Sequence, residues 1–71
     1  MNFKNIEAFV AVYKFGGFSA ASEKLCTTQP AISSRINNLE KDLGCQLFDR
    51  TNKSITLTRN GYQLLPLAEH L

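Results

Sequence analysis

The chain has 71 residues, of which 44% are hydrophobic and 20% are charged, and its formal net charge is +2. This length is sufficient for one domain, and a chain of this size buries only about 60% of its unfolded surface, so we expect a small core. The length leaves no room for separate cofactor and substrate domains. The ordinary apolar content and low net charge argue against a disordered chain.

Targeting signals and metal ligands are also limited by the sequence. No apolar run reaches about 18 residues, which excludes a transmembrane helix, and residues 1–7 lack the pattern of a secretory signal, so we expect a cytoplasmic protein. Cys26 and Cys45 fit that compartment as reduced thiols, with a disulfide between them as the alternative. His70 and two distant cysteines cannot supply a four-ligand zinc site, so we expect neither metal nor cofactor.

The first predicted element is a helix over residues 3–15. Asn2 is its expected N-cap, and Gly16 with Gly17 should end it because glycine readily adopts the left-handed conformation. Its apolar side chains recur at helical spacing and are expected to form one buried face. They are Phe3, Ile6, Phe9, Val10 and Tyr13.

A short second helix is predicted over residues 19–25. Ser19 is its expected cap, Ala20 and Ala21 should allow another helix to approach closely, and Leu25 should anchor it in the core. Residues 26–28 then form a tight turn.

The third helix, over residues 29–43, has the most complete signals. Thr28 is a good N-cap, Pro30 lies in the first turn, where a missing N–H costs little, and Gly44 is the expected stop. Helical spacing places four apolar side chains on one buried face: Ile32, Ile36, Leu39 and Leu43. The opposite face is nearly free of acidic groups and carries Pro30, Ser33, Ser34, Asn37 and Lys41.

After Gly44 the hydrophobic period changes to that of strands. Residues 47–50 and 55–58 are predicted to form a hairpin around residues 51–54, with Lys53 at its tip. Thr58 is expected to cap a last helix whose apolar side carries Leu64, Leu65, Ala68 and Leu71. Pro66 should kink or end that helix because it removes a backbone hydrogen bond.

The positive charge is concentrated near the hairpin. Residues 47–61 hold Arg50, Lys53 and Arg59 against Asp49 alone. This segment is either part of a scattered, solvated surface or a local basic patch that suits a polyanion. Composition by itself does not choose between the two.

The order of elements predicts a mainly α, winged helix-turn-helix fold, with a three-helix core, a two-stranded β wing and the start of a C-terminal helix. This arrangement suits duplex DNA, because a helix fits the major groove and the first residues of a recognition helix reach the base edges. Gln29 can bond adenine, and Ser33 and Ser34 can bond bases or phosphates. Lys53 could lie near a minor groove or the backbone.

Several segments in unbroken order resemble the LysR-type transcriptional regulators of bacteria. The likeness covers nearly the whole chain and is carried by Phe18-Ser19-Ala20-Ala21-Ser22-Glu23-Lys24-Leu25, Thr28-Gln29-Pro30-Ala31-Ile32-Ser33, Leu39-Glu40, Leu43-Gly44, Leu47-Phe48-Asp49-Arg50 and Leu57-Thr58-Arg59-Asn60-Gly61. The resemblance implies sequence-specific binding of double-stranded DNA, with residues 29–43 in the major groove and the wing, residues 47–58, on the backbone or minor groove.

The resemblance also implies a set of DNA-contacting residues, to which Arg35 and Asn37 of the third helix are added. On the third helix and its cap they are Thr28, Gln29, Pro30, Ser33, Ser34, Arg35 and Asn37, and beyond it Arg50, Lys53 and Thr58. Ser34 stands where the family often has Arg, so Arg35 either flanks the groove or contacts it. Ser22 and Cys26 stand where Ala and Gly are commoner, and Cys26 is expected to be a small packing residue rather than a redox sensor.

The family likeness further implies a division of the chain and its partners. Residues 1–58 are expected to form the DNA-binding domain, and residues 59–71 the start of a linker helix that pairs two subunits into a homodimer or higher homo-oligomer. We expect the effector-sensing domain that normally follows to be absent from these 71 residues, so that any small-molecule effector would bind elsewhere in a longer regulator. We expect no membrane partner.

The sequence also bears on two other classes of function, catalysis and protein binding. An enzyme is not expected, because the single histidine lies near the chain end and neither a nucleophile grouping nor a phosphate loop is present. The competing hypothesis is a winged helix that binds another protein without specific DNA binding.

Overall fold

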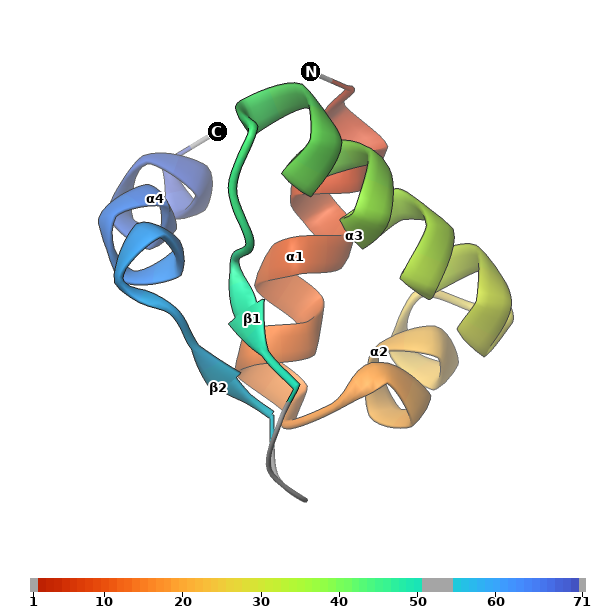
Figure 1. Cartoon of the computed structure of the whole chain (residues 1–71). Coiled ribbons are helices and arrows are strands. Elements are labelled where there is room, and N and C mark those ends of the chain that lie inside the picture. Colours follow the sequence, from red (N-terminus) through yellow and green to blue (C-terminus); the bar gives the residue numbers. More distant parts are fainter. Residues whose placement is uncertain (1, 51–54, 71) are drawn as a thin grey trace.

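The computed structural model describes residues 2–50 and 55–70, which form four helices and one two-stranded sheet (Figure 1). In chain order they are α1 (Phe3–Phe15), α2 (Phe18–Lys24), α3 (Gln29–Leu43), β1 (Phe48–Asp49), β2 (Thr56–Leu57) and α4 (Arg59–Glu69). α1 contacts each of the other three helices. The predicted mainly α, winged helix-turn-helix fold is confirmed.

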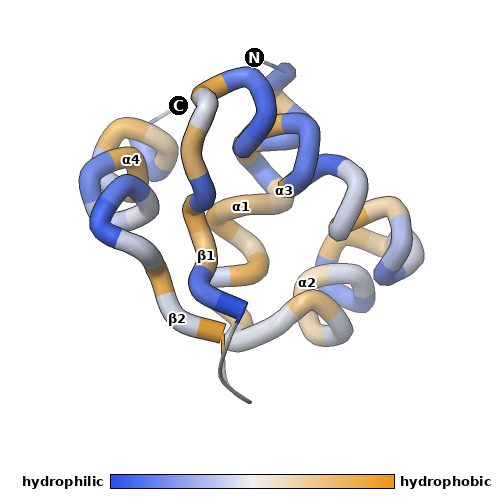
Figure 2. The backbone as a smooth tube through the Cα atoms, in the orientation of Figure 1, coloured by the Kyte–Doolittle hydropathy of each residue, from blue (hydrophilic) through white to orange (hydrophobic). Residues whose placement is uncertain are grey.

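The core lies where the inner sides of α1, α3 and the hairpin meet. Phe9, Ile36 and Leu39 are completely buried, and the rings of Phe9 and Phe48 lie 5.3 Å apart between centroids. Figure 2 shows α1 as mostly hydrophobic and α3 as mostly hydrophilic. α3 therefore packs along a narrow stripe and leaves most of its surface polar.

Both long helices begin and end at the predicted caps. The side chains of Asn2 and Thr28 each accept a hydrogen bond from an N–H in the first turn of the helix that follows. Gly16 and Gly44 close the two helices in the left-handed conformation, with φ of 84° and 70°. These caps satisfy backbone groups that have no partner within the helix.

The predicted apolar faces of these helices include side chains that are exposed. Phe3 is 60% exposed, Tyr13 47% and Leu43 38%, because they lie at or near helix ends, beyond the elements that cover the middle. Ala8 and Val12 are buried on α1 instead. The neighbouring helices cover a stripe that is rotated from the one defined by the largest side chains.

α2 differs from its prediction at the first turn. Ser19 does not cap it: the helix begins at Phe18, Gly17 is the N-cap, and no side chain caps the N-terminus. The carbonyl of Gly17 already accepts the N–H of Ala21, so the helix starts earlier than predicted. Ser19 lies inside the helix, where its carbonyl accepts a 2.7 Å hydrogen bond from the buried Ser22 hydroxyl.

The turn between α2 and α3 depends on a left-handed residue, Cys26, with φ of 55°. Its N–H donates to the Glu23 carbonyl, and the N–H of Thr27 donates to the Ser22 carbonyl, a bonding pattern that closes helices and favours glycine at the left-handed position. The predicted packing role of Cys26 was wrong, since the residue is exposed. The structural role of Cys26 is therefore the left-handed backbone conformation of the turn, and not the packing of its side chain.

The wing is an antiparallel pair in which Phe48 faces Leu57 and Asp49 faces Thr56. The strands are shorter than the predicted four-residue runs, but their direction and sequence position are confirmed. Gly61, in the first turn of α4, packs directly against this hairpin. A Cβ there would collide with the Leu47 carbonyl oxygen and come within 2.9 Å of Leu57 Cδ2.

α4 starts at its predicted cap and continues past Pro66 to Glu69, so Pro66 does not end the helix. Pro66 and Tyr62, the residue whose carbonyl would accept the missing N–H, are both exposed, and water can satisfy that carbonyl. The predicted apolar side is confirmed for the described residues: Leu65 and Ala68 are buried and Leu64 is half-buried. Leu71 lies outside the described residues.

Candidate nucleic-acid interface

The outer side of α3 presents a continuous polar face. Most of its predicted contact residues are exposed, and Ser33 and Arg35 are half-buried; the exposed ones are Thr28, Gln29, Pro30, Ser34 and Asn37. Ile32 and Ile36 hold the opposite side in the core. The fold thus exposes five of the predicted residues of α3 and its cap, whereas helical spacing places the half-buried Arg35 toward the side of Ile32 and Leu39.

The N-terminal end of α3 is suited to negative charge. Its first turn contains no acidic residue, and the unpaired N–H groups there carry partial positive charge. Thr28 Oγ1 already accepts the N–H of Ala31 at 3.2 Å, which leaves its hydroxyl hydrogen for another acceptor.

α2 supports this end of α3 from behind. Ala21 is completely buried, and α2 and α3 are in contact. A small side chain allows another helix to approach closely, and Ala20, the other residue predicted for this role, is half-buried. The short turn at Cys26 then fixes the direction in which α3 leaves α2.

The C-terminal half of α3 is joined to the wing by a group of side chains that we call the wing clamp: Asn37, Glu40 and Arg50. Arg50 Nη2 lies 3.2 Å from Glu40 Oε1, and Nη1 donates to Asn37 Oδ1 at 3.3 Å. Glu40 Oε2 accepts the N–H of Leu47 at 2.7 Å. Sequence reasoning missed Glu40 as an interface residue, because its partners come from a different element.

Thr58 and Lys53 are the other predicted wing contacts, and the structure describes only Thr58. Thr58 Oγ1 accepts the N–H of Gly61 and donates to the Gln46 carbonyl at 2.6 Å, so it ties the hairpin to α4. Thr58 begins α4, which lies on the other side of β1 from α3 in Figure 1. Lys53 lies outside the described residues.

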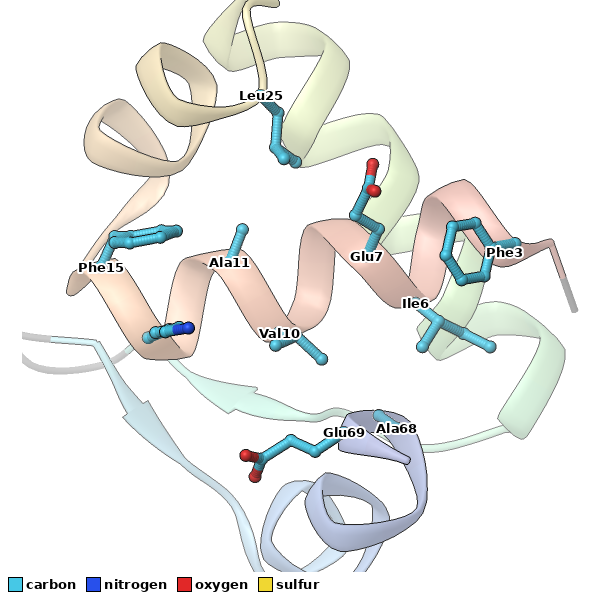
Figure 3. A pocket seen from close by; sticks show the side chains of 10 residues that line it. Phe3, Ile6, Glu7, Val10, Ala11, Phe15, Leu25, Ala68 and Glu69 are labelled. Carbon is cyan, nitrogen blue, oxygen red and sulfur yellow. The ribbon is translucent and has the colours of Figure 1, made fainter. Parts of the chain in front are cut away.

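A groove of about 330 Å³ lies between α1, the end of α2 and α4. Figure 3 shows Leu25 on one side of α1 and Ala68 and Glu69 on the other, with Phe15 toward one end of the helix. The lining of the groove is largely apolar, and its charged residues are the carboxylates of Glu7 and Glu69 and the ammonium of Lys14, a net charge of −1. That combination does not suit a polyanion, so the polar face of α3 is the candidate DNA surface.

The described residues were compared with the requirements of a metal site and of a membrane-spanning helix. Within residues 2–50 and 55–70 there is no group of three or more His, Cys, Asp or Glu side chains that could hold a metal ion. Over the same residues, no helix has the length and apolar character needed to cross a bilayer. Cys26 and Cys45 are free thiols.

The fold and this surface define a winged helix-turn-helix protein of the DNA-binding class. The sequence matches the family described as "Bacterial regulatory helix-turn-helix protein, lysR family" over residues 3–62. The chain belongs to that family, and the resemblance drawn from its motifs is confirmed.

Individual relatives agree with this assignment. An HTH-type transcriptional regulator of Azotobacter vinelandii, from the ibpB-leuC intergenic region, is 47% identical over 96% of this chain and 47% of its own length. Crystal structures of the BenM and CbnR DNA-binding domains in complex with DNA are each 36% identical to this chain and cover 99% of it. The matches cover 79% and 80% of those two chains, with TM-scores of 0.93 and 0.92. The chain spans about half the length of the first relative and 21% of another, from Escherichia coli.

Proposed function

We propose that this domain reads duplex DNA by inserting the N-terminal half of α3 into the major groove. The observation that carries the proposal is the exposed, acid-free polar face at the start of α3, in a fold shared with domains crystallised on DNA. A helix of this kind fits the major groove with its first turns at the base edges. Gln29, Ser33 and Ser34 are assigned to base readout.

The remaining residues of the surface are assigned to phosphates and to the flanks. Thr28 and the helix N-terminus face a phosphate, Pro30 packs close to the backbone, and Arg35, half-buried on α3, flanks the groove. Lys53 and Thr58 contribute contacts to the backbone or minor groove. Phosphate contacts set affinity and orientation, whereas base contacts set the sequence that is chosen.

Selection of bound duplexes from a random pool tests this assignment. Wild type should enrich one sequence family. Gln29→Ala and Ser33→Ala should change the preferred base at one position, at a cost of about 1–3 kcal/mol for the original base pair. Lys41→Ala, at the far end of α3, is the matched control and should keep the wild-type preference. An unchanged preference in both test variants would remove α3 as the reading element.

Homodimerisation through the outer side of α4 is the second part of the proposal. Tyr62 and Leu67 are 62% and 68% exposed there, and large apolar side chains at such exposure favour a protein contact. A dimer would bind two related half-sites, since half-site symmetry follows subunit symmetry. In a complex with the selected duplex, Leu67→Gln should lower the protein-to-DNA stoichiometry from two to one, whereas Leu43→Gln on α3 should not.

The domain organisation follows from the same assignment. Residues 1–58 act as the DNA-binding domain and residues 59–71 as the start of the linker helix, while effector sensing belongs to another part of a longer regulator. The role is binding without catalysis, in line with relatives that are named transcriptional regulators. A cytoplasmic location follows from a bacterial DNA partner.

A further inference from the structure

The wing clamp places one carboxylate between two elements that must meet DNA together. Glu40 projects from α3, and its Oε2 lies 2.7 Å from the backbone nitrogen of Leu47 and 3.4 Å from that of Phe48. These two N–H groups belong to the start of the wing. Only 11% of the Glu40 side chain is exposed, so the carboxylate bridges α3 and β1 from a largely buried position.

Arg50 holds the other oxygen of the same carboxylate. Its guanidinium is bonded to Glu40 Oε1 and to Asn37 Oδ1, and its Cζ lies 5.4 Å from the centre of the Phe18 ring. Contacts with a carboxylate, an amide and an aromatic face exploit the planar, multiply donating shape of the arginine side chain. Three contacts from α2 and α3 thus fix a side chain that leaves the hairpin.

The aromatic contact extends into the core. Phe18 packs edge-on against Phe48, with centroids 6.4 Å apart, and Phe48 packs against Phe9. Arg50 therefore covers the outer face of an aromatic row that joins α1, α2 and β1. This position restrains the guanidinium before any ligand is bound.

We propose that Glu40 and Arg50 are positioning residues that set the wing relative to the recognition helix, with Arg50 acting through Glu40 rather than through a phosphate. The inference rests on the DNA-binding function proposed above. It differs from the expectation drawn from the family resemblance, in which Arg50 touches the DNA. A positioning role and a phosphate contact predict different effects of Arg50→Gln on the salt dependence of binding.

A double-variant cycle on the selected duplex separates the roles. Glu40→Gln keeps an oxygen that can accept the Leu47 N–H but loses the ion pair, and Arg50→Gln removes the guanidinium. We expect each to weaken specific binding by roughly three- to tenfold, between the effect of an exposed ion pair and that of a hydrogen bond to a charged group. The double variant should bind no worse than either single variant, because both changes break one interaction.

The slope of log K against log[salt] is the deciding measurement. Each phosphate contact contributes about 0.9 to this slope, so a positioning role leaves the slope of Arg50→Gln near that of wild type. A fall of about one unit in Arg50→Gln, or losses that add in the double variant, would overturn the proposal. Asp42→Asn removes the same charge from the same helix at an exposed site and should not weaken binding.

Amide hydrogen exchange in the free domain tests the clamp without DNA. If Arg50 holds the Glu40 carboxylate in place, Arg50→Gln should speed exchange of the Leu47 and Phe48 amides about two- to fivefold at unchanged global stability. Unchanged exchange at both amides would count against the clamp. A wild-type domain that selects no sequence would defeat the proposed function, while this measurement would still decide the clamp.

Discussion

Gly61 shows how one missing side chain fixes the junction between wing and last helix. The position has no room for a Cβ, because the Leu47 carbonyl oxygen and Leu57 Cδ2 already occupy that space. Backbone is one of the two obstacles, so rotation of a side chain cannot relieve the overlap. The residue is needed for packing, not for an unusual φ.

Gly61→Ala should therefore destabilise the domain by about 1–3 kcal/mol, the usual cost of overpacking a fitted core. Chemical denaturation followed by circular dichroism measures the change. Gly17→Ala is the matched control, because a Cβ at Gly17 meets no atom within 4 Å and should change stability only slightly. Equal stability of Gly61→Ala and wild type would show that α4 can move away from the hairpin.

Cys26 offers the opposite case, in which a side chain is present where glycine would be preferred. Its φ of 55° costs energy for any residue with a Cβ. Cys26→Gly should raise the free energy of unfolding by about 0.5–1 kcal/mol, after the greater entropy of unfolded glycine is counted. Cys26→Ala retains the strain and should give no gain. A destabilised Cys26→Gly would mean that the thiol makes a compensating contact.

At the scale of elements, α3 combines two requirements in one helix. Its buried stripe attaches it to α1 and α2, and its outer face carries the candidate reading residues. Leu39 is completely buried and Leu43 is 38% exposed, although both were predicted to lie in the core. The two leucines therefore provide an internal comparison.

Leu39→Ala should cost about 2–5 kcal/mol, which is a large share of the stability of so small a domain. Leu43→Ala should cost much less, because its side chain is already partly in water. Thermal denaturation of the two variants, followed by the circular dichroism signal of their helices, provides the measurement. A stable Leu39→Ala variant would contradict the assigned core.

At the scale of the whole molecule, charge near the wing should control affinity more than the net charge of +2 indicates. Lys53→Ala should weaken binding to all duplexes to a similar degree and reduce the salt slope by about one unit, as expected for one lost phosphate contact. Fluorescence anisotropy at several salt concentrations measures both effects. Lys4→Ala, in the first turn of α1, is the control and should preserve the slope.

Salt dependence also separates DNA binding from the protein-contact hypothesis. Wild-type affinity for DNA should fall steeply as salt rises, because bound phosphates displace counterions. Affinity that is insensitive to salt would contradict a surface built on phosphate contacts.

The limits of prediction follow from the range of the interactions involved. Caps act within one turn, so Asn2, Thr28 and Thr58 could be identified from short sequence windows. Burial depends on neighbours from other elements, so the exposure of Phe3 and Tyr13 could not be read from helical spacing. The residues of the predicted reading face came from one helix and share a surface for that reason, whereas their contacts with DNA stay a prediction.

The sequence by itself determined the order and bounds of the long helices, the hairpin and the polar face of α3, because local propensity and periodicity act over a few residues. The family was identified separately, from the resemblance of motifs along nearly the whole chain. Only the tertiary structure decided that Cys26 is left-handed, that Gly61 touches the hairpin, and that Glu40 and Arg50 join α3 to the wing. These contacts link residues that lie in different elements. Their geometry depends on how the helices pack, which no local pattern encodes.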